Sequence, residues 1–307
     1  METPPPHTLN FTGILSTSKR IILSNYIHFV TLSIFFIPLT FTLVLTPTLH
    51  HSLSDVSGNP LNHKKLLLFY LLYTLIVNSF SLCSIATITF STHHVFSGEP
   101  IKIIDSVKSL IFSFFPLAFT AIIAYTLTIL ISLFFLMLVA TLLMLAHNIG
   151  FVINYNSLHF MWFSAIMSAM LIAIIVYVHV QWSLAFVVVV VESKWGFAAL
   201  TRSAYLVKGM RLVSLLLMLY CGVFGACIVW ICSQQVGVLV LMMLGSYFVM
   251  MILLRFVAAN TVLYNYCKAL HGELVIEVAD DHGFDHEYMS LGVGDEKVPR
   301  VVDVVAA

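Results

Sequence analysis

Apolar residues in this chain gather into six long runs that short polar segments separate. A helix needs about 20 mostly apolar residues to cross the roughly 30 Å hydrocarbon core of a bilayer. Each run can supply a helix of that length, and none shows the period-two alternation of membrane barrel strands. The pattern predicts six membrane-spanning helices, at about 27–49, 66–90, 110–147, 158–191, 212–232 and 236–259.

The last two spans share one apolar stretch, which is too long for a single crossing. Ser233, Gln234 and Gln235 interrupt it and mark the expected hairpin. The third and fourth runs exceed the length that a bilayer requires, so we expect these helices to tilt or to project beyond the membrane. Residues 1–267 are therefore predicted to form one all-α membrane domain.

The composition agrees with a membrane location, since 60% of residues are hydrophobic and only 9% are charged. Soluble domains carry about 25% charged residues. A chain of 307 residues cannot hide this much apolar surface in a soluble core. The formal net charge is zero, so nothing indicates a nucleic-acid partner. The bilayer itself is the expected partner.

The positions of lysine and arginine predict the orientation. Of the 14 basic residues, only Lys64 and Lys65 lie in a loop of odd number. The other twelve lie before the first span, in the second and fourth loops, or at and after the end of the sixth. Because cytoplasmic loops are enriched in Lys and Arg, both termini are predicted to be cytoplasmic. The membrane is expected to be the plasma membrane or an endomembrane.

A short amphipathic segment precedes each odd-numbered span, at 13–26, 101–114 and 196–210. Their apolar positions recur at helical spacing between basic residues, as in helices that lie in a membrane interface. The chain is thus predicted to consist of three repeats, each an interfacial helix followed by a membrane hairpin. These helices could anchor and cap the bundle, or they could sense curvature or anionic lipid.

The fourth loop carries a recognisable motif between Gly196 and Arg211. It reads Ala-Leu-x-x-Ser-x-x-Leu-x-Lys-Gly, in which the defined positions include Leu200, Ser203, Leu206, Lys208 and Gly209. This element resembles one in a multi-span family that includes YciC-like proteins and the membrane domain of some bacterial glycerophosphodiester phosphodiesterases. Over about 10–270 the chain more closely resembles plant six-span proteins of unknown function. The resemblance implies architecture and no catalytic residue.

The second span carries a polar stripe that includes Thr74, Asn78 and Ser81. Polar residues inside a membrane are the first functional candidates. They could line a solute path, but such residues more often bond to neighbouring helices. Asn78 lies mid-span, and we expect its amide to bond to a neighbouring helix. A histidine pair, His93–His94, does not share one helix face, so no metal site is expected.

The tail, residues 268–307, is acidic and is expected to be disordered and cytoplasmic. Tyr288 and Leu291 fit the Tyr-x-x-bulky pattern that clathrin adaptors bind as an extended strand. A clathrin adaptor and other membrane proteins are therefore candidate partners.

The sequence shows neither a nucleophile motif nor a phosphate-binding loop nor paired membrane carboxylates. We expect no catalytic residue, no cofactor and no enzyme activity. The leading hypothesis is a non-enzymatic scaffold or membrane-organising factor. The alternatives are a channel or transporter for a small solute and, less favoured, a lipid-handling membrane enzyme.

Overall fold

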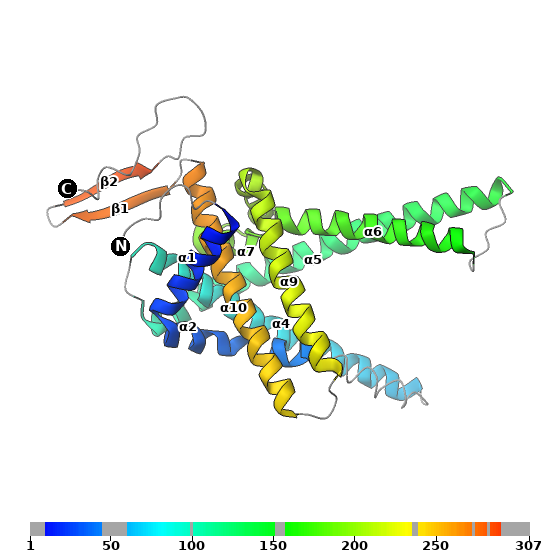
Figure 1. Cartoon of the computed structure of the whole chain (residues 1–307), viewed down its shortest axis with the longest axis horizontal. Coiled ribbons are helices and arrows are strands. Elements are labelled where there is room, and N and C mark those ends of the chain that lie inside the picture. Colours follow the sequence, from blue (N-terminus) through cyan, green and yellow to red (C-terminus); the bar gives the residue numbers. More distant parts are fainter. Residues whose placement is uncertain are drawn as a thin grey trace.

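The computed structural model describes residues 10–44, 60–98, 101–150, 157–234, 239–271, 274–280 and 283–289. Every described element between residues 10 and 271 is a helix (Figure 1). Six helical stretches are long and apolar enough to cross a membrane. The predicted class, an all-α multi-pass membrane protein with six spans, is confirmed.

The first span contains α2 (Tyr26–Ser33) and η2 (Ile34–Phe36), and its helix continues to Val44. The second and third spans are α4 (Pro60–Phe96) and α5 (Ile103–Asn148). The remaining spans and short helices are α6 (Leu158–Gln181), α7 (Ala185–Glu192), α8 (Phe197–Leu206), η3 (Val207–Gly209), α9 (Arg211–Gln234) and α10 (Leu239–Leu270).

Two spans differ in detail from the predicted ranges. The fourth is two helices, because a turn at Trp182–Leu184 separates α6 from α7. The sixth extends to Leu270 instead of ending near residue 259. Its last turns carry polar residues such as Asn265, which lower the hydropathy, but these side chains are buried and the helix continues between its neighbours.

Two of the three segments predicted to be interfacial helices form helices of their own. The N-terminal segment forms α1 (Phe11–Ser24), and 196–210 forms α8 and η3, all separate from the spans that follow. Segment 101–114 is not a separate helix, because α5 starts at Ile103 and continues through Pro116 without a break. The described chain therefore has two separate segments where the repeat predicted three.

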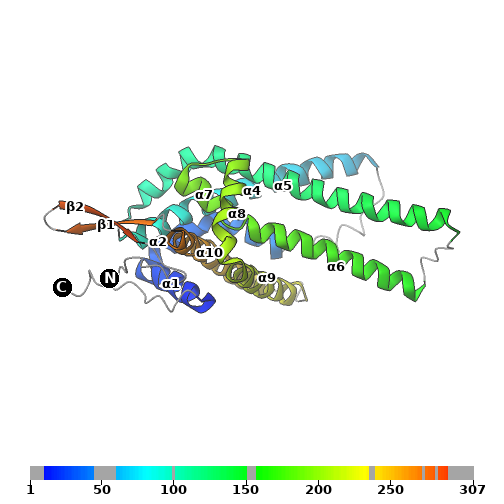
Figure 2. The ribbon, with the colours of Figure 1, turned by 90° about the horizontal axis from the view of Figure 1, so that it is seen from above.

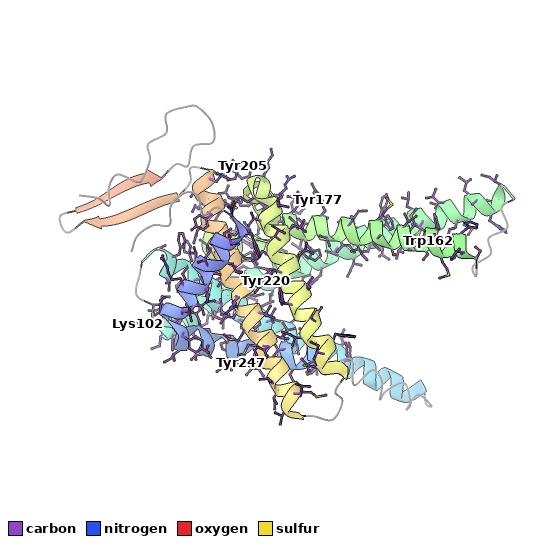
Figure 3. The ribbon with its side chains drawn as sticks, viewed as in Figure 1. Lys102, Trp162, Tyr177, Tyr205, Tyr220 and Tyr247 are labelled. Carbon is purple, nitrogen blue, oxygen red and sulfur yellow. The ribbon has the colours of Figure 1, made fainter. Side chains whose placement is uncertain are left out.

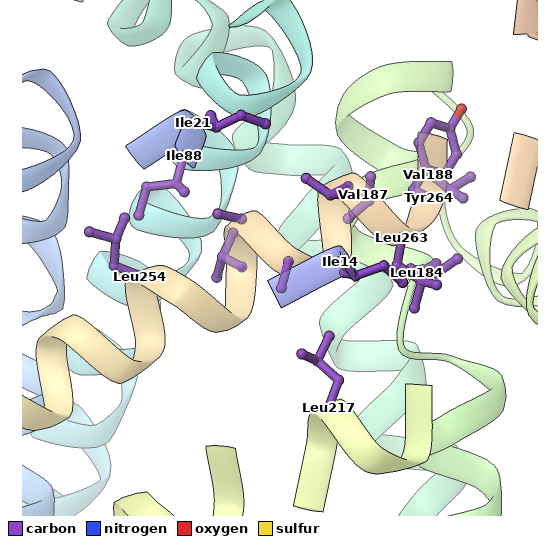
Figure 4. Packing of buried hydrophobic residues seen from close by; sticks show 14 of the residues in the cluster. Ile14, Ile21, Ile88, Leu184, Val187, Val188, Leu217, Leu254, Leu263 and Tyr264 are labelled. Atoms are coloured by element: carbon purple, nitrogen blue, oxygen red, sulfur yellow. The ribbon is translucent and has the colours of Figure 1, made fainter. Parts of the chain in front are cut away.

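The helices converge at one end of the molecule and separate at the other (Figures 1 and 2). The C-terminal parts of α4 and α10 meet α1, α7, α8 and the start of α5 in a convergence region. Its buried apolar core includes Ile14, Leu184, Leu254 and Leu263 (Figure 4). Burying such side chains removes each from water or lipid contact and gains dense dispersion contacts. Helix α1 packs mainly on α10, although the two are far apart in sequence.

Helices α5 and α6 leave the convergence region together and form an arm that lies apart from α9 and α10 (Figures 1 and 2). The arm exposes most of its large apolar side chains. Trp162, which Figure 3 shows on α6, is 64% exposed, and Phe134 on α5 is 74% exposed. Such a surface suits hydrocarbon, because lipid chains are as apolar as the side chains.

The tail contains a β-hairpin, formed by β1 (Leu274–Asp280) and β2 (Gly283–Met289). The strands are antiparallel, and Leu274 pairs with Met289. This differs from the disorder expected across 268–307. Strand β1 contains Val275, Ile276 and Val278, and β-branched residues favour an extended backbone.

Candidate functional site

The convergence region holds a cluster of polar side chains that we call the polar hub. Its members come from four helices. They are Glu192 on α7, Arg202 on α8, His93 on α4, and Tyr264 and Asn265 on α10. Both α10 side chains are fully buried, so leaving one of their polar atoms without a partner costs free energy.

Glu192 ends α7 and is the centre of the hub, with a side chain only 10% exposed. Arg202 donates from Nε to both carboxylate oxygens at 3.2 Å. Tyr264 donates its hydroxyl to Oε1 at 2.9 Å, and Lys194 donates to Oε2 at 2.8 Å. An ionised carboxylate offers about four acceptor sites, so these donors occupy its capacity. Glu192 therefore joins three segments and is poorly placed to accept a proton.

His93 and Asn265 extend the hub from α10 to α4. His93 Nδ1 lies 3.0 Å from Asn265 Oδ1, and the His93 ring meets the Tyr264 ring edge-on at 6.4 Å. The neighbouring His94 bonds instead to the carbonyl of Phe90 on its own helix. The two histidines thus have different partners, as expected for adjacent helical positions.

A second polar chain links the first three spans. His28 on α2 lies 3.1 Å from the Ser91 hydroxyl on α4, and Ser91 lies 2.9 Å from the Ser106 hydroxyl on α5. Both serines are fully buried. Because hydrogen bonds between membrane helices replace unsatisfied groups in hydrocarbon, this chain fixes how the three helices pack.

The turn between α6 and α7 is held by two serines from other helices. Ser203 on α8 donates to the Gln181 carbonyl at 2.8 Å and accepts from the Leu184 amide at 3.2 Å. Ser214 on α9 donates to the Ser183 hydroxyl at 2.7 Å. A helix break leaves backbone groups without helical partners. Ser203 supplies those partners, which explains its place in the fourth-loop motif.

The other motif residues also have structural positions. Leu200 and Leu206 are buried in the convergence region, whereas Lys208 is exposed. A Cβ atom at Gly209 would lie 2.8 Å from the Cδ2 atom of Leu270, so η3 approaches the end of α10 closely. The motif therefore describes how α8 and η3 dock, in agreement with the architectural role that the resemblance implies.

The loop from α7 to α8 rests on α5. Gly196 donates its amide to the Thr120 hydroxyl at 2.8 Å. Its backbone, with φ +67° and ψ −137°, is one that residues with a Cβ rarely adopt. Trp195 beside it meets the Phe119 ring at 5.2 Å. The glycine therefore allows the loop to reach α5.

The residues of the predicted polar stripe on α4 lie in different environments. Ser81 is buried and donates to the Val77 carbonyl, while the half-buried Thr74 donates to the Tyr70 carbonyl. Asn78 is exposed, and its side-chain amide makes no hydrogen bond with a described residue. The amide that was expected to meet a neighbouring helix thus lies on the outer surface of the chain.

The proposed sorting motif is only partly described. Tyr288 lies in β2, where it pairs with Val275 of β1. Leu291 lies outside the described residues.

Several polar groups at the convergence region have no hydrogen-bond partner among the described residues. Ser84 Oγ, Thr89 Oγ1, Thr92 Oγ1 and Asn265 Nδ2 are all buried. In the described part of the chain, no three His, Cys, Asp or Glu side chains come together as a metal site requires. The region can therefore offer hydroxyl and amide groups, whereas the carboxylate of Glu192 is already paired.

Sequence reasoning did not identify the hub. The predicted fourth span, 158–191, stops one residue before Glu192, and the predicted sixth span stops at 259, before Tyr264 and Asn265. One signal was available, since Asn260, Thr261 and Asn265 continue an apolar run with three buried polar residues. Polar residues inside a membrane helix mark contacts with other helices.

We expect Ser203→Ala to lower the free energy of unfolding by about 1–3 kcal/mol, because it leaves the Leu184 amide buried without its acceptor. Unfolding in detergent micelles measures the change. Thr201→Ala is the control, since Thr201 is exposed and bonds only to its own helix. Equal stability of the two variants would show that Ser203 does not hold the α6–α7 turn.

Comparison with known families identifies one whose model covers most of the chain. The model of a family described as "Domain of unknown function (DUF8558)" matches residues 48–295. Searches of curated proteins and of solved structures each return no match. The matched range starts after the first span and includes α4 to α10, and thus every residue of the polar hub. The chain therefore belongs to the DUF8558 family.

Proposed function

We propose that this protein is a non-enzymatic membrane scaffold that organises other membrane proteins. The main observation in support is the contrast between the convergence region and the arm. Polar side chains in the hub bind one another, with Glu192 already accepting from Arg202, Tyr264 and Lys194. Catalysis needs a group that is free to exchange a proton or attack a substrate. The hub instead joins helices.

The arm supplies a lateral surface for partner helices. On α6, the exposed residues Ser164, Ala165, Ser168 and Ala169 are small and recur four apart. Small residues let membrane helices approach closely and gain packing and hydrogen-bond contacts. Because the arm stands apart from α9 and α10, a partner helix can reach this face without displacing the core.

A channel or transporter for a small solute is the second candidate. The hydroxyls of Ser84, Thr89 and Thr92, which have no partner in the described part of the chain, favour it, because polar groups inside a membrane protein often contact a solute. The predicted stripe gives it less support, since Thr74 and Ser81 bond to their own helix. His179 likewise lies 2.9 Å from the Ile175 carbonyl on α6.

Proximity labelling in native cells tests the scaffold proposal. We expect Ser164→Leu with Ser168→Leu to remove the membrane proteins labelled by the wild type, because bulk on this face prevents close approach. Val223→Leu with Val240→Leu is the control, since both positions are exposed outside the arm. An unchanged labelled set in a folded arm variant contradicts the proposal. Solute flux through vesicles of the purified protein would favour transport instead.

We also propose that both termini face the cytoplasm, from the plasma membrane or an endomembrane. The basic residues Lys102, Lys194 and Lys208 all lie near the convergence region, in the second and fourth loops, as the positive-inside rule requires for the cytoplasmic side. In sealed native vesicles with the cytoplasmic face outward, protease should remove tags from both ends. Protection of either tag would refute this orientation.

We also propose that the chain is distantly related to other families of multi-span membrane proteins. The fourth-loop motif supports kinship with YciC-like and phosphodiesterase-linked bacterial domains, and the resemblance over about 10–270 supports kinship with plant six-span proteins. A clathrin adaptor is a proposed partner of Tyr288 and Leu291, because adaptors bind such peptides as strands.

A further inference from the structure

Asn78 lies at the centre of the apolar part of α4. Leu66 and Phe90, the ends of the predicted apolar run, each lie twelve positions from it. At 1.5 Å per helical residue, each end is about 18 Å away along the helix. A short amide side chain cannot reach the headgroups from that depth. Its exposed position therefore leaves it facing hydrocarbon, where an unsatisfied amide costs several kcal/mol.

The other polar side chains nearby are hydrogen-bonded within their own helices. Thr74, Ser79 and Ser81 each donate to a carbonyl of α4 itself. Asn260 on α10 donates to the Phe256 carbonyl in the same way. Asn78 makes no such bond with any described residue. Its partner must come from outside this part of the chain.

The surface around Asn78 has the spacing of a helix-pairing seam. Leu68, Leu71 and Leu75 precede it at intervals of three, four and three residues, and the three leucines are 63–65% exposed. Alternating steps of three and four place residues along one stripe that faces a partner helix in a left-handed pair. A single asparagine within such a seam fixes register and oligomeric state.

We infer that this stripe pairs with the same stripe of a second copy of the chain. Two copies inserted with the same orientation carry Asn78 at the same depth, so a twofold axis along the membrane normal brings the two amides together. An amide has both a donor and an acceptor, so each Asn78 donates to the carbonyl oxygen of the other. Acyl chains cannot satisfy either group. An unrelated helix would need a matching polar residue at that depth.

This inference does not depend on the scaffold proposal, because a transporter could pair through the same helix. Energy transfer between donor- and acceptor-labelled full-length protein in phosphatidylcholine vesicles tests it, with the protein-to-lipid ratio varied. We expect the wild type to show ratio-dependent pairing. Asn78→Leu should raise the dissociation constant of the pair about three- to thirtyfold, the range for hydrogen bonds between membrane helices. Asn78→Gln retains the amide and should keep most of the pairing.

Thr141→Leu is the matched control, since it also removes an exposed polar group, one that bonds only to its own helix. Thr141 lies on α5, outside the small-residue face of α6, and its replacement should leave pairing unchanged. In a background with the five cysteines replaced by alanine, Leu75→Cys should form an oxidative cross-link between copies, and Leu133→Cys on the arm should not. A monomeric wild type, or Asn78→Leu pairing as tightly as the wild type, overturns the inference. So does a cross-link at Leu133 in place of Leu75.

Discussion

Glu192→Ala is expected to lower the free energy of unfolding by about 3–5 kcal/mol, the range for removing one partner of a buried ion pair. Arg202, whose side chain is only 18% exposed, would lose its carboxylate. The buried Tyr264 hydroxyl would lose its acceptor as well. Unfolding in mixed micelles, followed by helical signal against denaturant, measures the change.

Lys194→Ala gives the control for Glu192, because it removes another bond to the same carboxylate from a side chain that is 49% exposed. Exposed pairs contribute about 0–1 kcal/mol, so this variant should remain close to the wild type. If Glu192→Ala were no more damaging than Lys194→Ala, the hub would not hold α7, α8 and α10 together.

Gly196→Ala should lower the free energy of unfolding by about 2–5 kcal/mol, through backbone strain and overpacking together. Its φ of +67° disfavours any residue with a Cβ. The added Cβ atom would lie 3.1 Å from Cε1 of Phe119 and 3.3 Å from Cδ1 of Ile123, so α5 or the loop must shift. Thermal unfolding in one detergent provides the comparison with the wild type.

Gly98→Ala separates the two causes. Gly98 also has a positive φ, +83°, but a Cβ atom there meets no heavy atom within 4 Å. It should therefore show the strain alone, about 1 kcal/mol. Two variants of equal stability would show that the contact of Gly196 with α5 is unimportant. Partial recovery in Gly196→Ala combined with Phe119→Ala would confirm that the Phe119 ring is the obstacle.

The six spans were predictable because hydrocarbon imposes one requirement on every residue of a span. The range 110–147 anticipated most of α5 for that reason. The polar hub was not predictable, since Glu192 and Tyr264 are 72 positions apart and no local pattern pairs them. The extension of α10 was missed because buried amides lower hydropathy just as exposed ones do. For Asn78, hydropathy predicts its depth in the membrane, but it cannot predict the direction in which the side chain faces.

The packing of α1 on α10 has a consequence for biosynthesis. More than 200 residues separate the end of α1 at Ser24 from the start of α10 at Leu239. At about 5–20 residues per second, a ribosome needs roughly 10–50 s to make that interval. During this time α1, whose Ile14, Ile21 and Ile22 are buried in the complete structure, lacks the helix on which it mainly packs. The nascent chain therefore needs protection at its N-terminus until translation ends, and a chain that stops before Leu239 leaves α1 a target for quality-control proteases.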